Sequence, residues 1–187
     1  NDASFYQPAG LVFDEEANTL YVADTGNHTI RQISWPDRKV VTIAGTGLCG
    51  LSPGEGGAGT MTALNAPRDL ALMGGYLYIA MAGARQIWRL DTATHEIEPY
   101  AGSGQDGLVD GPLDKAAFVE PSGIVTDGEV LYVADSGASA IRRIKRGMVE
   151  TFIGRSPDDF GDLDTIARMA RIHHSKGIAY HEGLIYL

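Results

Sequence analysis

The stretch LYVADTGNHTIRQI, residues 20–33, joins two apolar segments through a short polar turn. The same pattern returns as LYIAMAGARQIWRL at 77–90 and as LYVADSGASAIRRI at 131–144, and the chain ends on IYL at 185–187. The first apolar segment of each copy does not alternate with polar residues, which is typical of a strand buried on both faces. A phrase that recurs along a chain predicts a repeat architecture.

Two further signals accompany this phrase. Each unit opens on a short apolar phrase, which begins with Pro in all but the last copy, and each complete unit closes on Gly. The openings are PAGLVFD (8–14), PRDLALM (67–73), PSGIVTD (121–127) and SKGIAYH (175–181), and the closings are VTIAG (41–45), EPYAG (98–102) and ETFIG (150–154). These signals together predict four short antiparallel strands in each unit.

A repeated four-stranded unit is typical of the blade of a β-propeller. We therefore expect an all-β chain with three complete four-stranded blades and the start of a fourth. The blades are predicted at about 8–45, 67–102 and 121–154, with the next beginning at 175, and residues 1–187 together form one partial propeller.

The polar turn has a composition of its own. Asp24 and Asp135 precede it, and we expect their carboxylates to accept hydrogen bonds from the backbone amides of the turn. Gly26 and Gly137 lie inside it, where we expect the positive φ that glycine adopts without steric cost.

The composition argues against several classes of function and structural feature. The formal net charge of −9 and the pI of about 4.9 argue against nucleic-acid binding, which depends on cationic contacts to phosphate. The single cysteine, Cys49, allows no disulfide within these residues. No apolar run approaches the roughly 18 residues of a membrane span, so none is expected. The sequence does not assign a compartment, and the cytoplasm is preferred.

The segment Asp24–Ile30 reads Asp-x-Gly-Asn-His-x-Ile and resembles the signature of NHL repeats, as do the Pro-x-Gly openings. This resemblance implies a propeller that usually has six blades. A narrower resemblance is carried by IAMAGARQIW (79–88), YAGSG (100–104), AAFVEPSG (116–123) and FGDLD (160–164). These phrases are similar to the propeller of NHL-repeat proteins that carry a thioredoxin-like domain.

The narrower resemblance implies a thioredoxin-like domain in the full-length protein and a redox-linked role. The redox cysteines of that group lie in the thioredoxin-like domain, and no Cys-x-x-Cys is present here, so no redox activity is carried over. The second and third units also depart from the signature, with Ala84-Arg85 and Ala138-Ser139 in place of Asn-His.

The opening residues ASFYQP (3–8) align with TALNAP (62–67) and AAFVEP (116–121), which end blade connections. The last residues stop inside a predicted strand. We therefore expect the chain to be a piece of a larger propeller, and we expect the isolated piece to be poorly soluble or to pair with another copy.

In an up-and-down blade, the turn between the second and third strands lies on the same face as the connection to the next blade. The predicted connections 46–65, 103–119 and 155–173 exceed the roughly 12–15 residues beyond which plain loops are uncommon. We therefore expect a protein or small-ligand partner to bind on this loop-rich face. The candidate binding residues are Arg68, Asp69 and Lys176 at the starts of innermost strands, and Asn27, His28 and Arg85 in the turns.

Other functions stay open. A metal-dependent enzyme at the propeller axis, similar to the amidating lyases, would need clustered His, but His28, His95, His173, His174 and His181 match no zinc spacing. No catalytic residue, metal or other cofactor is therefore assigned. RNA binding would use the basic cluster formed by Arg142, Arg143, Lys145 and Arg146, against an acidic chain.

The Asp-rich segments DGLVDGPLD (106–114) and DDFGDLD (158–164) could supply oxygen ligands to Ca²⁺, although neither has the EF-hand spacing. Solvated loops are the default interpretation of both. The interpretation that the sequence favours is a non-enzymatic propeller that serves as a scaffold or recognition module.

Overall fold

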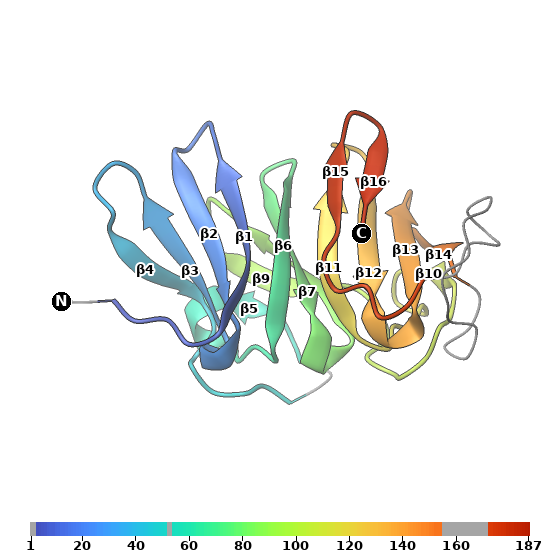
Figure 1. Cartoon of the computed structure of the whole chain (residues 1–187). Coiled ribbons are helices and arrows are strands. Elements are labelled where there is room, and N and C mark those ends of the chain that lie inside the picture. Colours follow the sequence, from blue (N-terminus) through green and yellow to red (C-terminus); the bar gives the residue numbers. More distant parts are fainter. Residues whose placement is uncertain (1–2, 52–53, 155–171) are drawn as a thin grey trace.

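The computed structural model describes residues 3–51, 54–154 and 172–187, and these form four antiparallel sheets (Figure 1). The first sheet contains β1 (Pro8–Asp14), β2 (Thr19–Asp24), β3 (Thr29–Ser34) and β4 (Val40–Ala44) in sequence order. The second contains β6 (Pro67–Met73), β7 (Tyr76–Met81), β8 (Gln86–Asp91) and β9 (Glu96–Ala101), with β5 (Gly57–Ala58) added beside β9.

The third sheet has the same strand order as the second. It contains β11 (Pro121–Thr126), β12 (Leu131–Asp135), β13 (Ala140–Lys145) and β14 (Met148–Ile153), with β10 (Gly111–Pro112) beside β14. The fourth is the hairpin of β15 (Ala179–His181) and β16 (Leu184–Tyr186). The described chain is therefore all-β, as the repeat predicts, and the two short edge strands come from the long connections.

The sheets stand beside one another like blades, with their first strands gathered in the middle (Figure 1). β6 contacts both β1 and β11, and β11 contacts β15. The hairpin turns of each sheet point to one face, whereas the short 3₁₀ turns η1 (Thr25–Asn27), η3 (Ala82–Ala84) and η4 (Ser136–Ala138) lie on the opposite face with the blade connections. We call this second face the loop-rich face.

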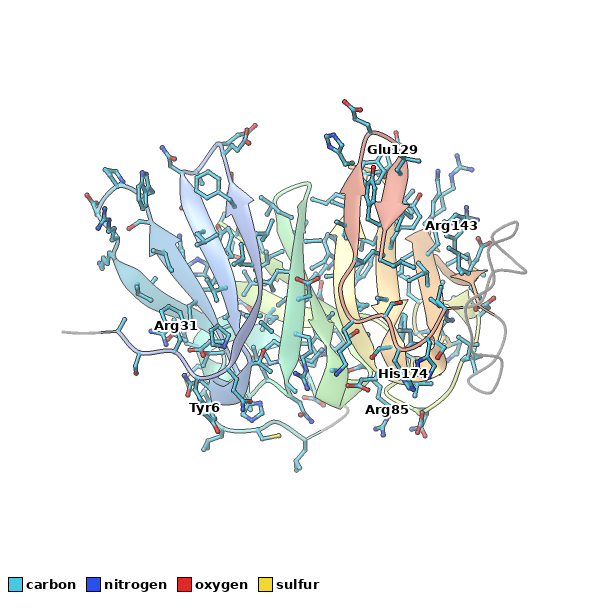
Figure 2. All side chains as sticks on the ribbon, viewed as in Figure 1. Tyr6, Arg31, Arg85, Glu129, Arg143 and His174 are labelled. Carbon is cyan, nitrogen blue, oxygen red and sulfur yellow. The ribbon has the colours of Figure 1, made fainter. Side chains whose placement is uncertain are left out.

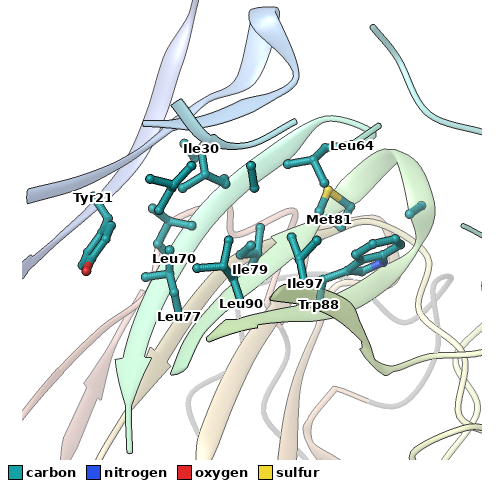
Figure 3. Close-up of a cluster of buried hydrophobic side chains, with 14 residues drawn as sticks. Tyr21, Ile30, Leu64, Leu70, Leu77, Ile79, Met81, Trp88, Leu90 and Ile97 are labelled. Carbon is teal, nitrogen blue, oxygen red and sulfur yellow. The ribbon is translucent and has the colours of Figure 1, made fainter. Parts of the chain in front are cut away.

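The core lies between adjacent sheets rather than inside any one of them. Side chains from the first and second sheets meet in the cluster of Figure 3, which includes Tyr21, Ile30, Leu70 and Ile79. A second cluster fills the space between the second and third sheets, where Phe118 is completely buried. The middle strands of the second sheet are apolar without alternation because that sheet has a neighbouring sheet on each side.

The expectation of a positive φ at Gly26 and Gly137 is wrong. The left-handed residue of each turn comes two positions later, at His28 (φ 52°), Arg85 (φ 54°) and Ser139 (φ 50°). Gly26 is needed for close approach, because its N–H donates to the Tyr6 carbonyl at 2.8 Å and an added Cβ would lie 2.6 Å from that oxygen.

The expected hydrogen-bond partners of Asp24 and Asp135 also need correction. Asp24 is completely buried and accepts from the N–H of Tyr6 at 2.8 Å, with further bonds from the side chains of Asn27 and Arg31. Asp135 accepts from the N–H of Glu120 at 2.7 Å. Each carboxylate thus accepts from a backbone N–H of the connection that enters its own blade, and not from the backbone N–H groups of its own turn.

The second blade has apolar side chains where the first and third blades have a buried Asp and Arg. Met81 stands where the neighbouring blades have Asp24 and Asp135, and Trp88 stands where they have Arg31 and Arg142. Met81 is completely buried and Trp88 almost so. A buried ion pair and a buried apolar pair therefore occupy equivalent places in adjacent blades.

Candidate ligand-binding site

A cavity of about 310 Å³ opens where the inner strands of the blades begin. The residues that line it come from all four repeat units. They are Ala9, Gly10, Arg68, Asp69, Glu120, Ser122, Lys176 and Gly177. The structure therefore brings together three of the predicted binding residues, Arg68, Asp69 and Lys176.

The repeat explains why these side chains meet. Ala9, Arg68, Ser122 and Lys176 occupy equivalent positions in the four opening phrases. The next position is Gly in every unit but the second, since neighbouring strands approach closely there. An added Cβ on Gly123, for example, would lie 2.7 Å from the Lys176 carbonyl oxygen.

The second unit has Asp69 at this glycine position, so one carboxylate enters a region that is otherwise backbone. Its Oδ2 accepts a hydrogen bond from the N–H of Ile124 at 2.9 Å, across the gap between two blades. Its Oδ1 lies against Gly10 on the other side. Burial raises the pKa of Asp69, although the N–H groups of Ile124 and Leu70 act in the opposite direction.

The other charged side chains of the cavity differ from Asp69 in their contacts. Arg68 and Lys176 are exposed, and neither forms an ion pair with any residue of the described ranges. Glu120 is fixed through its backbone, which donates to Asp135 and accepts from Ser136 at 3.0 Å, while its carboxylate has no partner within the same ranges. Ser122 Oγ donates to a backbone carbonyl, with those of Ala134 and Lys176 both at 3.3 Å.

A second cavity of about 400 Å³ lies beside the first on the loop-rich face. Arg68 and Glu120 line both cavities. The predicted residue Arg85, labelled in Figure 2, lines the second one. Its guanidinium lies 3.8 Å from the Asp106 carboxylate. The two hollows therefore share a wall.

Asn27 and His28 line neither cavity. The Asn27 amide donates to Asp24 at 2.8 Å, and His28 Nδ1 accepts from the N–H of Ala66 at 3.1 Å. His28 thus joins the first blade to the next connection, whereas the Asn27 side chain bonds within its own blade.

Glu120 and Ser122 line the cavity but were not among the predicted binding residues. Ser122 has the same repeat position as Arg68 and Lys176, and Glu120 comes directly before the Pro that opens its unit. Alignment of the opening phrases, extended by one residue toward the N-terminus, contains the signal that would have found both.

The acidic segment 106–114 does not gather its carboxylates. Asp106 faces Arg85, Asp110 binds Arg142 and Thr151, and Asp114 pairs with Lys115. Within the described residues no group of His, Cys, Asp and Glu is placed to hold a metal ion. The other acidic segment, 158–164, lies outside the described residues.

The expected basic cluster is not a continuous surface. Arg142 is completely buried, and Arg143 pairs with Glu150 at 2.5 Å. The four cations of the cluster are therefore not all presented on one surface. Nor does the described part of the chain contain a helix of the length and apolarity needed to cross a membrane.

We expect Asp69→Asn to gain stability relative to the wild type as pH rises above about 4. An ordinary carboxyl loses its proton near pH 3.9, and burial raises the pKa of Asp69 in the folded state. Between these two pKa values the folded chain binds more protons than the unfolded chain, so stability falls with rising pH. Asn keeps an acceptor for the Ile124 N–H but carries no charge.

Urea unfolding at several pH values between 3.5 and 7 measures this effect. Asp127→Asn is the matched control with the opposite sign. Burial acts to raise the pKa of Asp127, but hydrogen bonds from the N–H groups of Glu129 and Val130 outweigh it and lower the pKa. Its replacement should therefore lose stability relative to the wild type as pH rises. A stability difference for Asp69→Asn that is constant with pH would contradict the prediction.

Comparison with known proteins agrees with this architecture. The model of the NHL repeat matches residues 5–33. The chain is 34% identical over its whole length to Protein SUPPRESSOR OF QUENCHING 1, chloroplastic, of Arabidopsis thaliana, and 31% identical to NHL repeat-containing protein 2 of Homo sapiens. It spans 19% and 30% of the lengths of these two relatives.

Solved structures share the fold at lower sequence identity. A Bacteroides thetaiotaomicron protein of unknown function has a TM-score of 0.75 at 21% identity, over 94% of this chain and 42% of that one. An auxiliary nutrient binding protein from the same organism has a TM-score of 0.68 at 23% identity, over 92% of this chain and 42% of that one. The repeat match, the relatives and these structures together support an NHL β-propeller for this chain.

Proposed function

We propose that this chain is a non-enzymatic recognition module of a longer protein, and that it binds a protein or small-ligand partner on its loop-rich face. The observation that carries the proposal is the cavity at the inner strands. Arg68 and Lys176 come from different repeat units, line one hollow and have no ion-pair partner in the described ranges. Unpaired charges in a concave site are typical of groups that orient a ligand.

The arrangement of the cavity favours binding over nucleophilic catalysis. The Ser122 hydroxyl is directed at backbone carbonyls rather than at a side chain that could accept its proton. The Asp69 carboxylate is occupied by a backbone N–H. A nucleophile needs a base within hydrogen-bond reach, and the Ser122 hydroxyl has none among its contacts.

The proposal has a redox-linked part. The phrases around residues 79–88 and 116–123 resemble NHL-repeat proteins that carry a thioredoxin-like domain, and we propose such a domain in the full-length protein. The open reading frame that encodes these residues tests this part directly. A thioredoxin-like domain with Cys-x-x-Cys in the same frame supports it, and a frame without one overturns it.

The binding part is tested in the full-length protein with two charge-reversed variants. Arg68→Glu with Lys176→Glu changes the cavity, whereas Lys145→Glu with Arg146→Glu makes the same charge change in the β13–β14 turn on the opposite face. Proteins and small molecules retained from native extract are quantified by mass spectrometry. We expect the cavity variant to lose at least one partner about tenfold or more, since a charged hydrogen bond contributes roughly 1.5–3 kcal/mol.

The opposite-face variant should retain the same partners as the wild type. Circular dichroism verifies that both variants are folded before the comparison. Identical partner profiles for the two variants would show that the loop-rich face does not carry the recognition.

A further inference from the structure

We propose that the cavity at the inner strands recognises a small zwitterion, in which one short molecule carries both an ammonium and a carboxylate group. This inference rests on the proposed recognition function and names the ligand chemistry. Four charged side chains line a space of about 310 Å³: two cationic, Arg68 and Lys176, and two acidic, Asp69 and Glu120. None of them forms an ion pair with another at 4.0 Å or less.

Opposite charges that share a cavity without pairing leave both signs available to a ligand. A simple anion would satisfy Arg68 and Lys176 but would place its charge near the two carboxylates. A simple cation would meet the reverse problem. A molecule with both charges satisfies each set, and the balance of two cations against two carboxylates matches its zero net charge.

The acidic residues of the cavity are held by backbone contacts. Asp69 accepts from the Ile124 N–H through Oδ2 at 2.9 Å. Ser122 donates its hydroxyl proton to a carbonyl, so its oxygen lone pairs remain able to accept from an ammonium. Glu120 is placed by two backbone hydrogen bonds to the turn of its own blade. These groups require little reorganisation when a cation binds.

The two cationic side chains can adjust to the ligand. Arg68 and Lys176 are exposed and have long side chains, so both can reach a carboxylate. The lining also includes Gly10 and Gly177, which carry no side chain. Around Gly177 there is open space, because an added Cβ would meet nothing within 4 Å.

The size of the cavity limits the ligand. A volume of about 310 Å³ lies at the lower end of the range of roughly 300–1,000 Å³ that is usual for small-molecule sites. It is large enough for a molecule of amino-acid size and too small for a folded segment of a partner. The second cavity, beyond Arg68 and Glu120, gives room for one substituent.

A series of ω-amino acids tests the proposal and measures the separation of the charges. Glycine, β-alanine, γ-aminobutyrate and δ-aminovalerate are titrated into the full-length protein by calorimetry or by NMR, with butyrate and butylammonium as singly charged controls. We expect one length of the series to bind about tenfold or more tightly than either control, since the controls leave one set of charges unmatched.

Variants assign the two ends of the ligand. Glu120→Gln should weaken the best zwitterion and butylammonium but not butyrate, whereas Lys176→Gln should weaken the zwitterion and butyrate but not butylammonium. Lys145→Gln, on the opposite face, should change none of them. Butyrate binding as tightly as every zwitterion would overturn the proposal in favour of a simple anion site.

Failure of the whole series to bind at 50 mM would also overturn it. The charge-reversed variants described above separate this failure from that of the proposed function. If the cavity variant still loses a partner from native extract, recognition by this face stands and only the ligand class is wrong. If that variant keeps every partner as well, both proposals fail.

Discussion

Replacing Arg142 with Met is expected to lower the free energy of unfolding by about 3–5 kcal/mol, the usual cost of removing one partner from a buried ion pair. Arg142 is completely buried and joins the third blade to the connection that precedes it. Its guanidinium donates to the carbonyls of Ala117 at 2.7 Å and Val109 at 2.8 Å, and to the Asp110 carboxylate at 2.9 Å. The substitution removes all three bonds, although the two carbonyls still accept from the N–H groups of Val109 and Ala117, and the carboxylate from the Thr151 hydroxyl.

The effect extends to Asp135, whose carboxylate lies 3.6 Å from the same guanidinium and is itself completely buried. Without Arg142 no cation faces this carboxylate from the described part of the chain, so ionisation becomes more costly there. The guanidinium also lies 5.0 Å from the centre of the Phe118 ring, and that cation–π contact is lost too. Charge, hydrogen bonding and packing therefore act in the same direction.

Arg143→Met is the matched control for this prediction. The neighbouring Arg143 pairs with Glu150, but both side chains are substantially exposed, at 36% and 51%. Surface pairs of this kind contribute about 0–1 kcal/mol. Urea denaturation of the two variants gives the comparison. A loss for Arg142→Met no larger than that for Arg143→Met would show that the buried network does not stabilise the blade.

The strands were predictable because their signal is local and repeated. The apolar run at residues 20–23 predicts a buried strand, and β2 occupies Thr19–Asp24. Three copies of the same phrase fix the same four-stranded plan, and each hairpin is closed by residues near one another in sequence. The edge strands β5 and β10 were not predicted. Each consists of two residues, and each pairs with the last strand of the blade that follows its connection.

The partners of Asp24 and Arg142 could not be read from the sequence. Asp24 binds the N–H of Tyr6, which lies 18 positions earlier, and nothing local distinguishes that amide from those of the adjoining turn. Arg142 looked like part of a basic surface beside Arg143, because alternate residues of a strand face opposite sides and the sequence does not say which side is covered. The connection that enters the third blade covers the side on which Arg142 lies.

The candidate site was partly predictable for a geometric reason. Equivalent positions of a repeat gather around the propeller axis, so Arg68 and Lys176 could be placed together without any knowledge of their contacts. Asn27 and His28 were also predicted as binding residues, but the Asn27 amide donates to Asp24 and the His28 ring accepts from the N–H of Ala66. Arg85 has the same left-handed backbone as His28 and lines the second cavity. The partner of each turn side chain therefore decides its direction, and the sequence motif does not specify that partner.

Met81→Asp is expected to be as damaging as the loss of Arg142, with a cost of about 3–5 kcal/mol, because it buries a carboxylate without a cation. Met81 is completely buried in the cluster of Figure 3, beside Leu64 and Trp88. The first and third blades have Asp at this position, so the backbone accommodates the residue. What the second blade lacks is the arginine, since Trp88 occupies its place.

Met81→Leu provides the control, because a volume-conserving apolar change usually costs less than about 1.5 kcal/mol. The decisive measurement is the double variant Met81→Asp with Trp88→Arg, which restores the pair that the adjacent blades use. If the charged pair and the apolar pair are alternative solutions to one packing problem, the double variant recovers part of the loss, with a coupling of about 0.5–3 kcal/mol. Strictly additive losses in urea denaturation would show instead that the second blade has diverged beyond exchange with its neighbours. The incoming connection offers a reason for full recovery to fail: Phe5 and Phe118 lie against the arginines of the first and third blades, whereas the second blade has Leu64 there.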